Sequence, residues 1–356
     1  MIKKILTLSK RLISIPSTKE NPKELDRVLN LVKKELKDVT IEEFEKDGAK
    51  SILAYNSKAR SKRFKIILNA HLDVVPGKIN QFSAIEKNGE LFGRGSYDMK
   101  AAAAVMILVF KEIFKKIKYP LALQLVTDEE IGGFNGTKFQ IEQEVLADFV
   151  IAGENTDLTI INRAKGIVQA KITATGKSAH GAYPWLGDNA VLKINSIINS
   201  ILKKYPVPKK EVWKTTVNIS SIKSTNNTVN KVPDNSSVFL DIRYIPEDNN
   251  KIVPFLKRLE KPGVKMEILL NEPCAYTEEN NPYINKLSCS VKNVLGAKAE
   301  ILSHHGGSDI RHFNLVGCRG IEFGPIGRGH HTDSEWVEIK SLENYYNILK
   351  DFLLKR

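Results

Sequence analysis

The feature of this chain that most limits its fold is a set of apolar runs, each followed by acidic or imidazole residues. The runs lie within KIILNAHLDVVPG, LALQLVTDEEIGG and FVIAGENTD. Continuous apolar runs of this length are typical of strands buried on both faces of a parallel sheet. In open α/β folds, ligands bind at the carboxyl ends of such strands. We therefore expect a polar site there, built from His71, Asp73, Glu129, Glu130 and Glu154, with Asp98 from the glycine-rich turn GRGSYDMK.

The order of the predicted elements divides the chain into two domains. Residues 1–164 alternate helices with buried strands, and residues 273–356 return to this alternation. Between them, residues 165–272 show half-exposed strands and amphipathic helices in the order β-α-β-β-α-β, which is that of a ferredoxin-like unit. We predict an α/β fold: a mostly parallel-sheet domain sandwiched by helices (1–164 and 273–356), into which a ferredoxin-like α+β domain (165–272) is inserted.

Two of the helices predicted in the larger domain have clear sequence signals. Met1–Ile15 has apolar residues spaced for one face, which indicates an amphipathic helix rather than a targeting segment. A second, longer helix is expected over Met99–Lys118, with Asp98 as its N-cap.

Composition excludes several classes of function. The net charge is +13, but the lysines are spread along predicted helices and do not form a patch with interleaved aromatic residues, so we expect no nucleic-acid partner. No apolar run approaches the roughly 18 residues that span a bilayer, so we expect no membrane association. Three cysteines without paired-ligand spacing fit reduced thiols. These observations together predict a soluble cytoplasmic protein.

The polar residues have the chemistry of a two-metal site. In the sequence His-x-Asp, His71 would be a ligand and Asp73 would hold its imidazole through the other ring nitrogen. Asp98 could bridge two ions with its two oxygens. One residue of the Glu129-Glu130 pair would bind metal while the other moves protons, and one histidine of the pair in GRGHHTDSEWVEI would complete the set. Each ion then has one imidazole and two carboxylates, which suits Zn²⁺, with Co²⁺ or Mn²⁺ as substitutes.

Each of these residues also has a simpler explanation. A single His-x-Asp after a strand is most often a surface turn, an isolated Glu-Glu is usually solvated, and Asp98 alone would be a helix cap. The metal site is favoured because four such clusters coincide at strand ends or turns close to glycine or proline.

The motifs HLDVVPG, GRGSYDMK, VTDEE, AGENTD and GHHTDSEWVEI, in this order, resemble the co-catalytic zinc aminoacylase and carboxypeptidase family. That family includes succinyl-diaminopimelate desuccinylase, acetylornithine deacetylase, aminoacylase and glutamate carboxypeptidase. The resemblance implies two Zn²⁺ ions per subunit, and it selects the histidine that lies four positions before Glu335. The implied ligands are His71, Asp98, Glu130, Glu154 and His331, with Asp98 bridging.

The resemblance also implies the remaining roles. Glu129 would be the general base that takes a proton from the metal-activated water, and Asp73 would orient His71. The inserted domain would be a lid and dimerisation domain, so we expect a homodimer in which His180 and Asn230 reach the partner's site. The expected substrate-binding residues are Arg243 for a substrate carboxylate and, for the acyl or side-chain pocket, Gly306, Gly307, Ser308 and Arg311.

The function implied is hydrolysis of the amide bond of a small anionic N-acyl amino acid, of the deacetylase or desuccinylase type. A metallo-di- or carboxypeptidase is the alternative, because a dipeptide offers the same amide and carboxylate. An inactive metal-binding homologue is the third hypothesis, against which Glu129 and all five presumed ligands argue. The chain departs from the family at a few positions, where Lys165 replaces the arginine common in desuccinylases and where Asn155, Ala101-Ala102 and His304-His305 are unusual.

Overall fold

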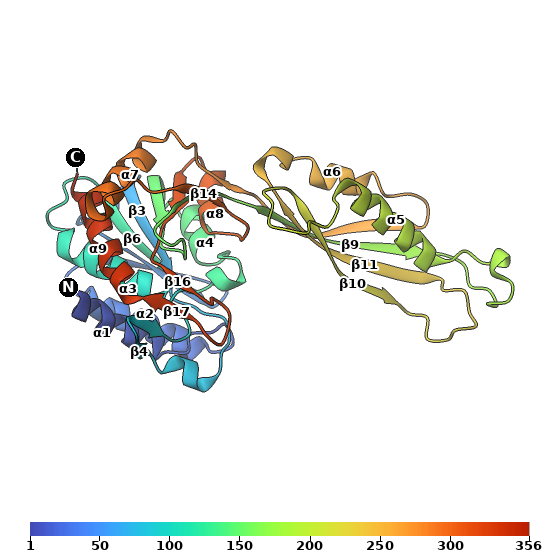
Figure 1. Ribbon diagram of the computed structural model, residues 1–356, viewed down its shortest axis with the longest axis horizontal. Helices are drawn as coiled ribbons and strands as arrows, with labels where there is room; N and C mark the ends of the chain where they lie inside the picture. The colour runs from blue at the N-terminus through green and yellow to red at the C-terminus, as the bar shows by residue number, and fades with distance from the viewer. Residues whose placement is uncertain (356) are drawn as a thin grey trace. The chain divides into compact units, whose positions relative to one another are not determined.

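The computed structural model describes residues 1–355, which form two compact units (Figure 1). The first unit contains Met1–Arg163, Tyr276–Leu302 and the chain from Ser308 onward. The second unit, called the inserted unit below, contains Ala164–Ala275 and the short segment Ser303–Gly307. The chain therefore leaves the first unit after Arg163 and returns at Tyr276 to complete it.

A central nine-stranded sheet organises the first unit, in the order β1-β2-β6-β3-β7-β15-β8-β13, with β14 paired to β8. Its middle strands β6, β3, β7 and β15 pair in parallel, whereas β1, β2 and β8 pair antiparallel. The predicted α/β class is confirmed, with antiparallel strands added at its edges. The strands are β1 Thr40–Lys46, β2 Ala49–Tyr55, β3 Phe64–His71, β6 Leu121–Val126, β7 Ala147–Ala152, β8 Ile160–Ala164, β13 Ala275–Tyr276, β14 Ile301–His304 and β15 Arg319–Glu322.

Helices cover both faces of this sheet. On one face Ile66 and Leu68 of β3 belong to the main apolar core, together with side chains of α1, α3 and α9. On the other face the packing is partly polar, because the Asn69 amide group donates to Thr137 of α4 at 3.2 Å. The helices of the unit are α1 Ile2–Ile13, α2 Pro22–Glu35, α3 Lys100–Ile113, α4 Thr137–Glu142, α7 Pro282–Leu295, α8 Ile310–Leu315 and α9 Ile339–Leu354.

Helix α3 differs from its prediction at both ends. Its N-cap is Met99, without a side-chain hydrogen bond, so the prediction that Asp98 caps this helix is wrong. The Asp98 carboxylate contacts the imidazoles of His71 and His331 instead. The helix also ends at Ile113, before the predicted Lys118. Among residues 1–355, no helix has both the length and the apolar character needed to cross a membrane.

A small antiparallel sheet, which the sequence did not predict, joins two distant loops. Its order is β16-β17-β5-β4, and β17 (Trp336–Glu338) pairs with β5 (Glu90–Phe92) through Trp336 opposite Phe92. The turn Gly93–Asp98 follows β5, and the loop that carries His331 precedes β17. This pairing therefore brings Asp98 and His331 together. The two other strands are β4 Ile85–Lys87 and β16 Gly327–Arg328.

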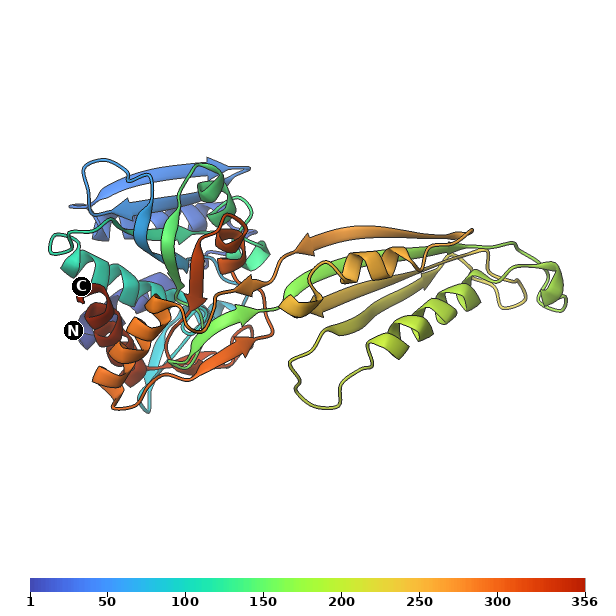
Figure 2. The ribbon, with the colours of Figure 1, turned by 90° about the horizontal axis from the view of Figure 1, so that it is seen from above.

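The inserted unit has the predicted ferredoxin-like topology. Its antiparallel sheet has the order β10-β11-β9-β12, and helices α5 and α6 pack on one face of it (Figure 2). Ile194, Ile197 and Ile201 of α5 bury one face of that helix against strand side chains such as Ile172 and Leu240. The elements are β9 Gly166–Thr175, α5 Ala190–Lys204, β10 Thr216–Ser224, β11 Asn235–Tyr244, α6 Ile252–Lys257 and β12 Val264–Glu272.

We predict that Gly324→Ala destabilises the first unit by about 1–3 kcal/mol, the usual cost of overpacking. A methyl group on Gly324 would lie 2.0 Å from the backbone oxygen of Glu154, and a backbone atom cannot move aside cheaply. Chemical unfolding of the metal-free protein measures the change. Gly306→Ala is the control, because its methyl group would meet its nearest atom, in His304, at 3.5 Å. Equal stability of the two variants would contradict the packing described for Gly324.

Candidate metal centre

His71 ends β3 with its two ring nitrogens in different environments. Its Nδ1 lies 3.0 Å from the backbone oxygen of Asp73, which can only accept, so Nδ1 carries the hydrogen. Its Nε2 faces carboxylates, at 3.1 Å from Asp98 Oδ1 and 4.0 Å from Glu154 Oε2. The Asp73 carboxylate lies 3.5 Å from Nδ1, so the carbonyl of Asp73 is the closer partner of the ring. This orientation leaves Nε2 facing the carboxylates, where it can bind a metal ion once its proton is released.

Asp98 lies between two imidazoles. Its Oδ1 is 3.1 Å from Nε2 of His71, and its Oδ2 is 3.2 Å from Nε2 of His331. Burial opposes ionisation of Asp98, but the hydrogen bonds from His331 and His71 hold its pKa below the usual range. One carboxylate thus presents a different oxygen to each histidine.

The ligand atoms form two groups that share Asp98. His71, Asp98 and Glu154 make one group, and Asp98, Glu130 and His331 make the other, with the ligand atoms of each group within 4.8 Å of one another. Nε2 of His331 lies 3.1 Å from Glu130 Oε2. Each group offers one imidazole nitrogen and two carboxylates, which is the donor set expected for Zn²⁺ and related ions.

The electrostatics of these groups fit a pair of bound cations. Oε1 of Glu154 is buried and has no hydrogen-bond partner among the described residues. Burial, followed by neighbouring carboxylates, raises the pKa of Glu154 well above its usual value. Hydrogen bonds to Asp98 and then Glu130 raise the pKa of His331 to about 10. A buried carboxylate without a hydrogen-bond partner costs free energy unless it coordinates a cation. These residues therefore fit a pair of bound metal ions.

The two neighbouring glutamates have separate surroundings. Glu130 belongs to the second ligand group, and its backbone N–H donates to Asp73 Oδ2 at 3.0 Å. Glu129 lies outside both groups. Burial raises the pKa of Glu129 well above its usual value, and the charges of Asp309, Glu130 and Asp98 add to this effect while His71 opposes it. A glutamate with a raised pKa is suited to accept and return a proton near neutral pH.

Glu335, which served in the sequence only to locate His331, is a buried link between two loops. Its Oε2 accepts from Arg94 Nη1 at 2.7 Å and from Gly95 N at 3.0 Å, and its Oε1 accepts from the backbone N–H groups of Tyr97 and Asp98 at 3.0 Å each. Arg94 and Glu335 are only 3% and 2% exposed. Glutamate in a polar, glycine-containing stretch gives no sequence signal of burial, so this role was not predicted.

The residues predicted to line the substrate pocket in the first unit are buried. Ser308 is 1% and Arg311 is 4% exposed. The Arg311 guanidinium donates to the backbone oxygens of Ser308 at 2.7 Å and Gly132 at 2.6 Å, and so contacts the turn that follows the glutamate pair. Beside it, Asp309 accepts from Thr137 Oγ1 at 2.5 Å. This buried polar network behind the glutamate turn was also not predicted.

The other predicted residues belong to the inserted unit. His180 and Asn230 lie on exposed loops, joined by the backbone bond from Gly181 N to Asn230 O at 2.6 Å. Arg243 is on β11, where Asp241 Oδ2 accepts from its Nε at 3.1 Å. Lys165 is 2% exposed, and its ammonium group lies 5.7 Å from the centre of the Trp213 ring. Gly306 and Gly307 lie in the short segment after β14.

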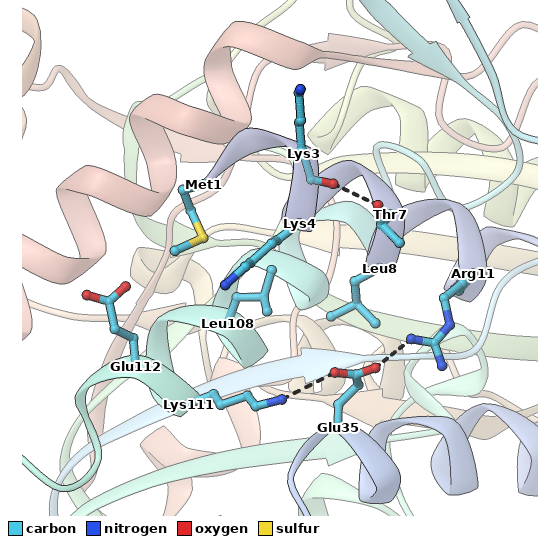
Figure 3. A pocket seen from close by; sticks show the side chains of 10 residues that line it. All are labelled: Met1, Lys3, Lys4, Thr7, Leu8, Arg11, Glu35, Leu108, Lys111 and Glu112. Carbon is cyan, nitrogen blue, oxygen red and sulfur yellow. Dashed lines mark hydrogen bonds and ion pairs between the residues drawn. The ribbon is translucent and has the colours of Figure 1, made fainter.

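A surface hollow of about 650 Å³ lies elsewhere on the first unit, between α1, α2 and α3 (Figure 3). In it, Glu35 accepts from Arg11 at 2.5 Å and from Lys111 at 3.4 Å. None of its lining residues belongs to the two ligand groups, so shape alone does not point to the metal centre.

This α/β fold and its paired ligand groups define a candidate two-metal hydrolase. The chain belongs to peptidase family M20/M25/M40, whose model matches residues 67–355. It is therefore a metal-dependent hydrolase that acts on amide or peptide bonds, and the family predicted from the motifs is confirmed.

Similar proteins cover nearly the whole chain. Succinyl-diaminopimelate desuccinylase of Buchnera aphidicola subsp. Cinara cedri is 31% identical over 99% of this chain and 98% of its own length. The protein of the same name from Pelagibacter ubique is 26% identical and covers 98% of both chains. The crystal structure of aminopeptidase PepT from Bacillus cereus has a TM-score of 0.83 at 18% identity, covering 99% of this chain and 98% of that one, which shows a shared fold.

We predict that binding of two Zn²⁺ ions at pH 7 releases at least two protons. Burial lowers the pKa of His71, but hydrogen bonds outweigh it and raise that pKa above its usual value, and hydrogen bonds raise the pKa of His331 to about 10. We therefore expect both imidazoles to carry a proton at pH 7 in the metal-free protein. A protonated nitrogen cannot bind metal. Because the pKa of His331 is raised, the proton competes below pH 10, and affinity at its group should rise about tenfold per pH unit up to there.

Calorimetry in buffers of different ionisation enthalpy counts the released protons. His331→Ala is the control, which should release one proton fewer and hold one ion fewer. Zinc binding without net proton release would contradict the protonation states assigned to the two histidines.

Proposed function

We propose that this protein hydrolyses the amide bond of N-acyl amino acids, as a deacetylase or desuccinylase. The observation that carries the proposal is the pair of ligand groups joined at Asp98, with the half-buried Glu129 near them. The similarity to proteins named succinyl-diaminopimelate desuccinylase, over almost the whole chain, supports the type of substrate.

Two Zn²⁺ ions would be held by this chain, one by His71, Asp98 and Glu154 and the other by Asp98, Glu130 and His331. When bound, such ions supply Lewis acidity, which lowers the pKa of water and polarises the substrate carbonyl. Asp73 connects the two ligand groups, because its backbone oxygen orients His71 and its carboxylate accepts a hydrogen bond from the backbone N–H of Glu130. The protein's contribution is thus a rigid set of donors at fixed separation.

Glu129 moves the proton. Its carboxylate takes a proton from the attacking water, whose oxygen forms a bond to the acyl carbon. Glu129 then delivers that proton to the amine nitrogen as the carbon–nitrogen bond breaks, so that a carboxylate and an amine leave. The raised pKa of Glu129 places its proton affinity closer to that of the groups with which it exchanges.

We further propose that positive charge in the inserted unit binds the substrate carboxylate. Arg243 is half-buried on β11, and Lys165 is buried immediately before β9. Burial, and then the charge of Arg243, lower the pKa of Lys165, which indicates that the two cations are close enough to repel each other. An anionic ligand would relieve this repulsion. Gly306, Gly307 and Ser308 would line the acyl pocket, with Arg311 holding the Ser308 backbone beside it.

We propose that the inserted unit acts as a lid and forms a homodimer. The N–H of Ala182 donates to Nδ1 of His180 at 3.1 Å, so the neutral ring carries its hydrogen on Nε2 and can donate it to an oxyanion. The neighbouring aromatic side chains Tyr183 and Trp185 are 52% and 73% exposed. Exposed apolar side chains next to a donor support a partner surface there, with His180 and Asn230 reaching the site of the other subunit.

A substrate panel tests the proposed activity. Zinc-loaded protein is assayed with N-succinyl and N-acetyl amino acids and with dipeptides, and we expect the acyl amino acids to be turned over fastest. Preference for dipeptides would replace the proposal with a di- or carboxypeptidase. No turnover of any member, with two ions bound, would identify an inactive homologue.

We predict that Glu129→Ala retains two Zn²⁺ ions but loses about 10²- to 10⁴-fold in kcat, the usual contribution of a general base. Elemental analysis and steady-state kinetics measure the two quantities. Glu142→Ala, at the end of α4, is the matched control and should leave both unchanged. Loss of an ion in Glu129→Ala would show that the roles of Glu129 and Glu130 are reversed.

We predict that His180→Ala lowers kcat at least tenfold while metal content stays constant, because removal of an oxyanion donor costs about 10²- to 10³-fold in well-studied sites. Lys177→Ala, on the same loop, is the control. Sedimentation of the wild-type protein should show a dimer. A normal turnover rate in His180→Ala would remove His180 from the reaction.

A further inference from the structure

The turn that carries Asp98 and the loop that carries His331 meet at a single carboxylate. Glu335 accepts four hydrogen bonds from the segment Arg94–Asp98, and one of them is the backbone N–H of Asp98 itself. The backbone oxygen of Glu335 also accepts from Gly93 N at 3.1 Å. Glu335 therefore binds the segment Gly93–Asp98 through both its side chain and its main chain.

The contact is buried and charged. Arg94 and Glu335 lie 2.7 Å apart with side chains 3% and 1% exposed. A buried ion pair of this kind depends on both partners, because removal of one leaves the other charge without compensation. Each carboxylate oxygen of Glu335 accepts hydrogen bonds from two N–H groups. In Glu335→Gln, the amide NH₂ group would replace one of these oxygens and would face N–H donors from which it cannot accept.

We propose that Glu335 is a positioning residue that fixes Asp98 against His331 and so sets the affinity of one of the two ions. The inference rests on the proposed metal centre. His331 needs such support because its side chain is 49% exposed and its backbone has a φ of 61°, in the left-handed region that residues other than glycine adopt uncommonly. Glu335 lies four residues further along the same loop.

The two ligand groups should depend on Glu335 unequally. His71 ends β3, and Glu154 follows the end of β7, and these strands are neighbours in the central sheet. That group retains its sheet framework and the contact of His71 with Asp98 when Glu335 is altered. The group of Asp98, Glu130 and His331 instead draws two of its members from the two loops that Glu335 joins. Loss of Glu335 should therefore weaken the ion of the second group selectively.

The test measures Zn²⁺ content of Glu335→Gln against buffered free Zn²⁺, beside His331→Ala as the reference for loss of the second ion. We expect one ion at wild-type affinity and the other weakened about 10- to 100-fold, the usual effect of residues that orient metal ligands. Thr277→Val is the control for general stability. It removes a buried hydroxyl that donates to the backbone oxygen of Gly320 at 2.6 Å, and it should lose stability without losing either ion.

Arg94 supplies a second pair of variants. Arg94→Gln leaves the three backbone donors to Glu335 in place and should weaken the same ion less than Glu335→Gln, and Arg94→Lys should restore part of the loss. If Glu335→Gln does not fold, Arg94→Gln tests the role of Glu335 instead, again by selective weakening of the ion of the second group. Wild-type affinity for both ions, or equal weakening of both, would overturn the role of Glu335. A wild-type protein that holds no Zn²⁺ would overturn the proposed metal centre itself.

Discussion

The division of the Asp98 carboxylate between two histidines is the interaction on which the geometry of the candidate metal centre depends. Each oxygen faces one Nε2 atom at 3.1 or 3.2 Å. Because the separation between the two oxygens of a carboxylate is fixed, both imidazoles must be placed accurately relative to each other. One of them, His71, comes from a strand end of the central sheet, and the other comes from a loop far along the sequence.

The fold satisfies this demand with two kinds of support. The parallel strands β3, β6 and β7 end at the same edge, so hydrogen-bonded strand pairing fixes the residues that follow them. The loops are fixed differently, by the short pairing of β17 with β5 and by the buried carboxylate of Glu335. A further polar network, with Arg311 donating to Gly132, holds the turn after the glutamate pair. The result is a cluster of carboxylates whose mutual repulsion would be offset by bound cations.

The sequence predicted the parts of the site that follow from strand periodicity. His71, Glu130 and Glu154 come at or just after the ends of apolar runs, and the structure brings them into the two ligand groups. His331 could be chosen over His330 only through the resemblance to a family, because nothing in the spacing of its loop indicates a strand end. The helix cap assigned to Asp98 was wrong, since a residue before a helix fits either role in a sequence.

Other features were beyond sequence reasoning for physical reasons. Strands of two or three residues, such as β16 and β17, carry too few side chains to show a period. Glu335 and Arg94 are buried because they pair with each other across the fold, and each alone reads as a surface residue. The ferredoxin-like topology of the inserted unit was predictable because its strands alternate regularly between buried and exposed residues.

The position of the inserted unit in the chain separates the two ligand groups during synthesis. His71, Asp98 and Glu154 all precede it, so a nascent chain carries one complete set of donors before the insertion has been translated. The second set waits for His331, and β15, a neighbour of β7 in the central sheet, is also translated after the insertion. Completion of the central sheet and of the second ligand group therefore belong to the same late stage of biosynthesis. A chain whose synthesis stops within the insertion would carry only the first ligand group.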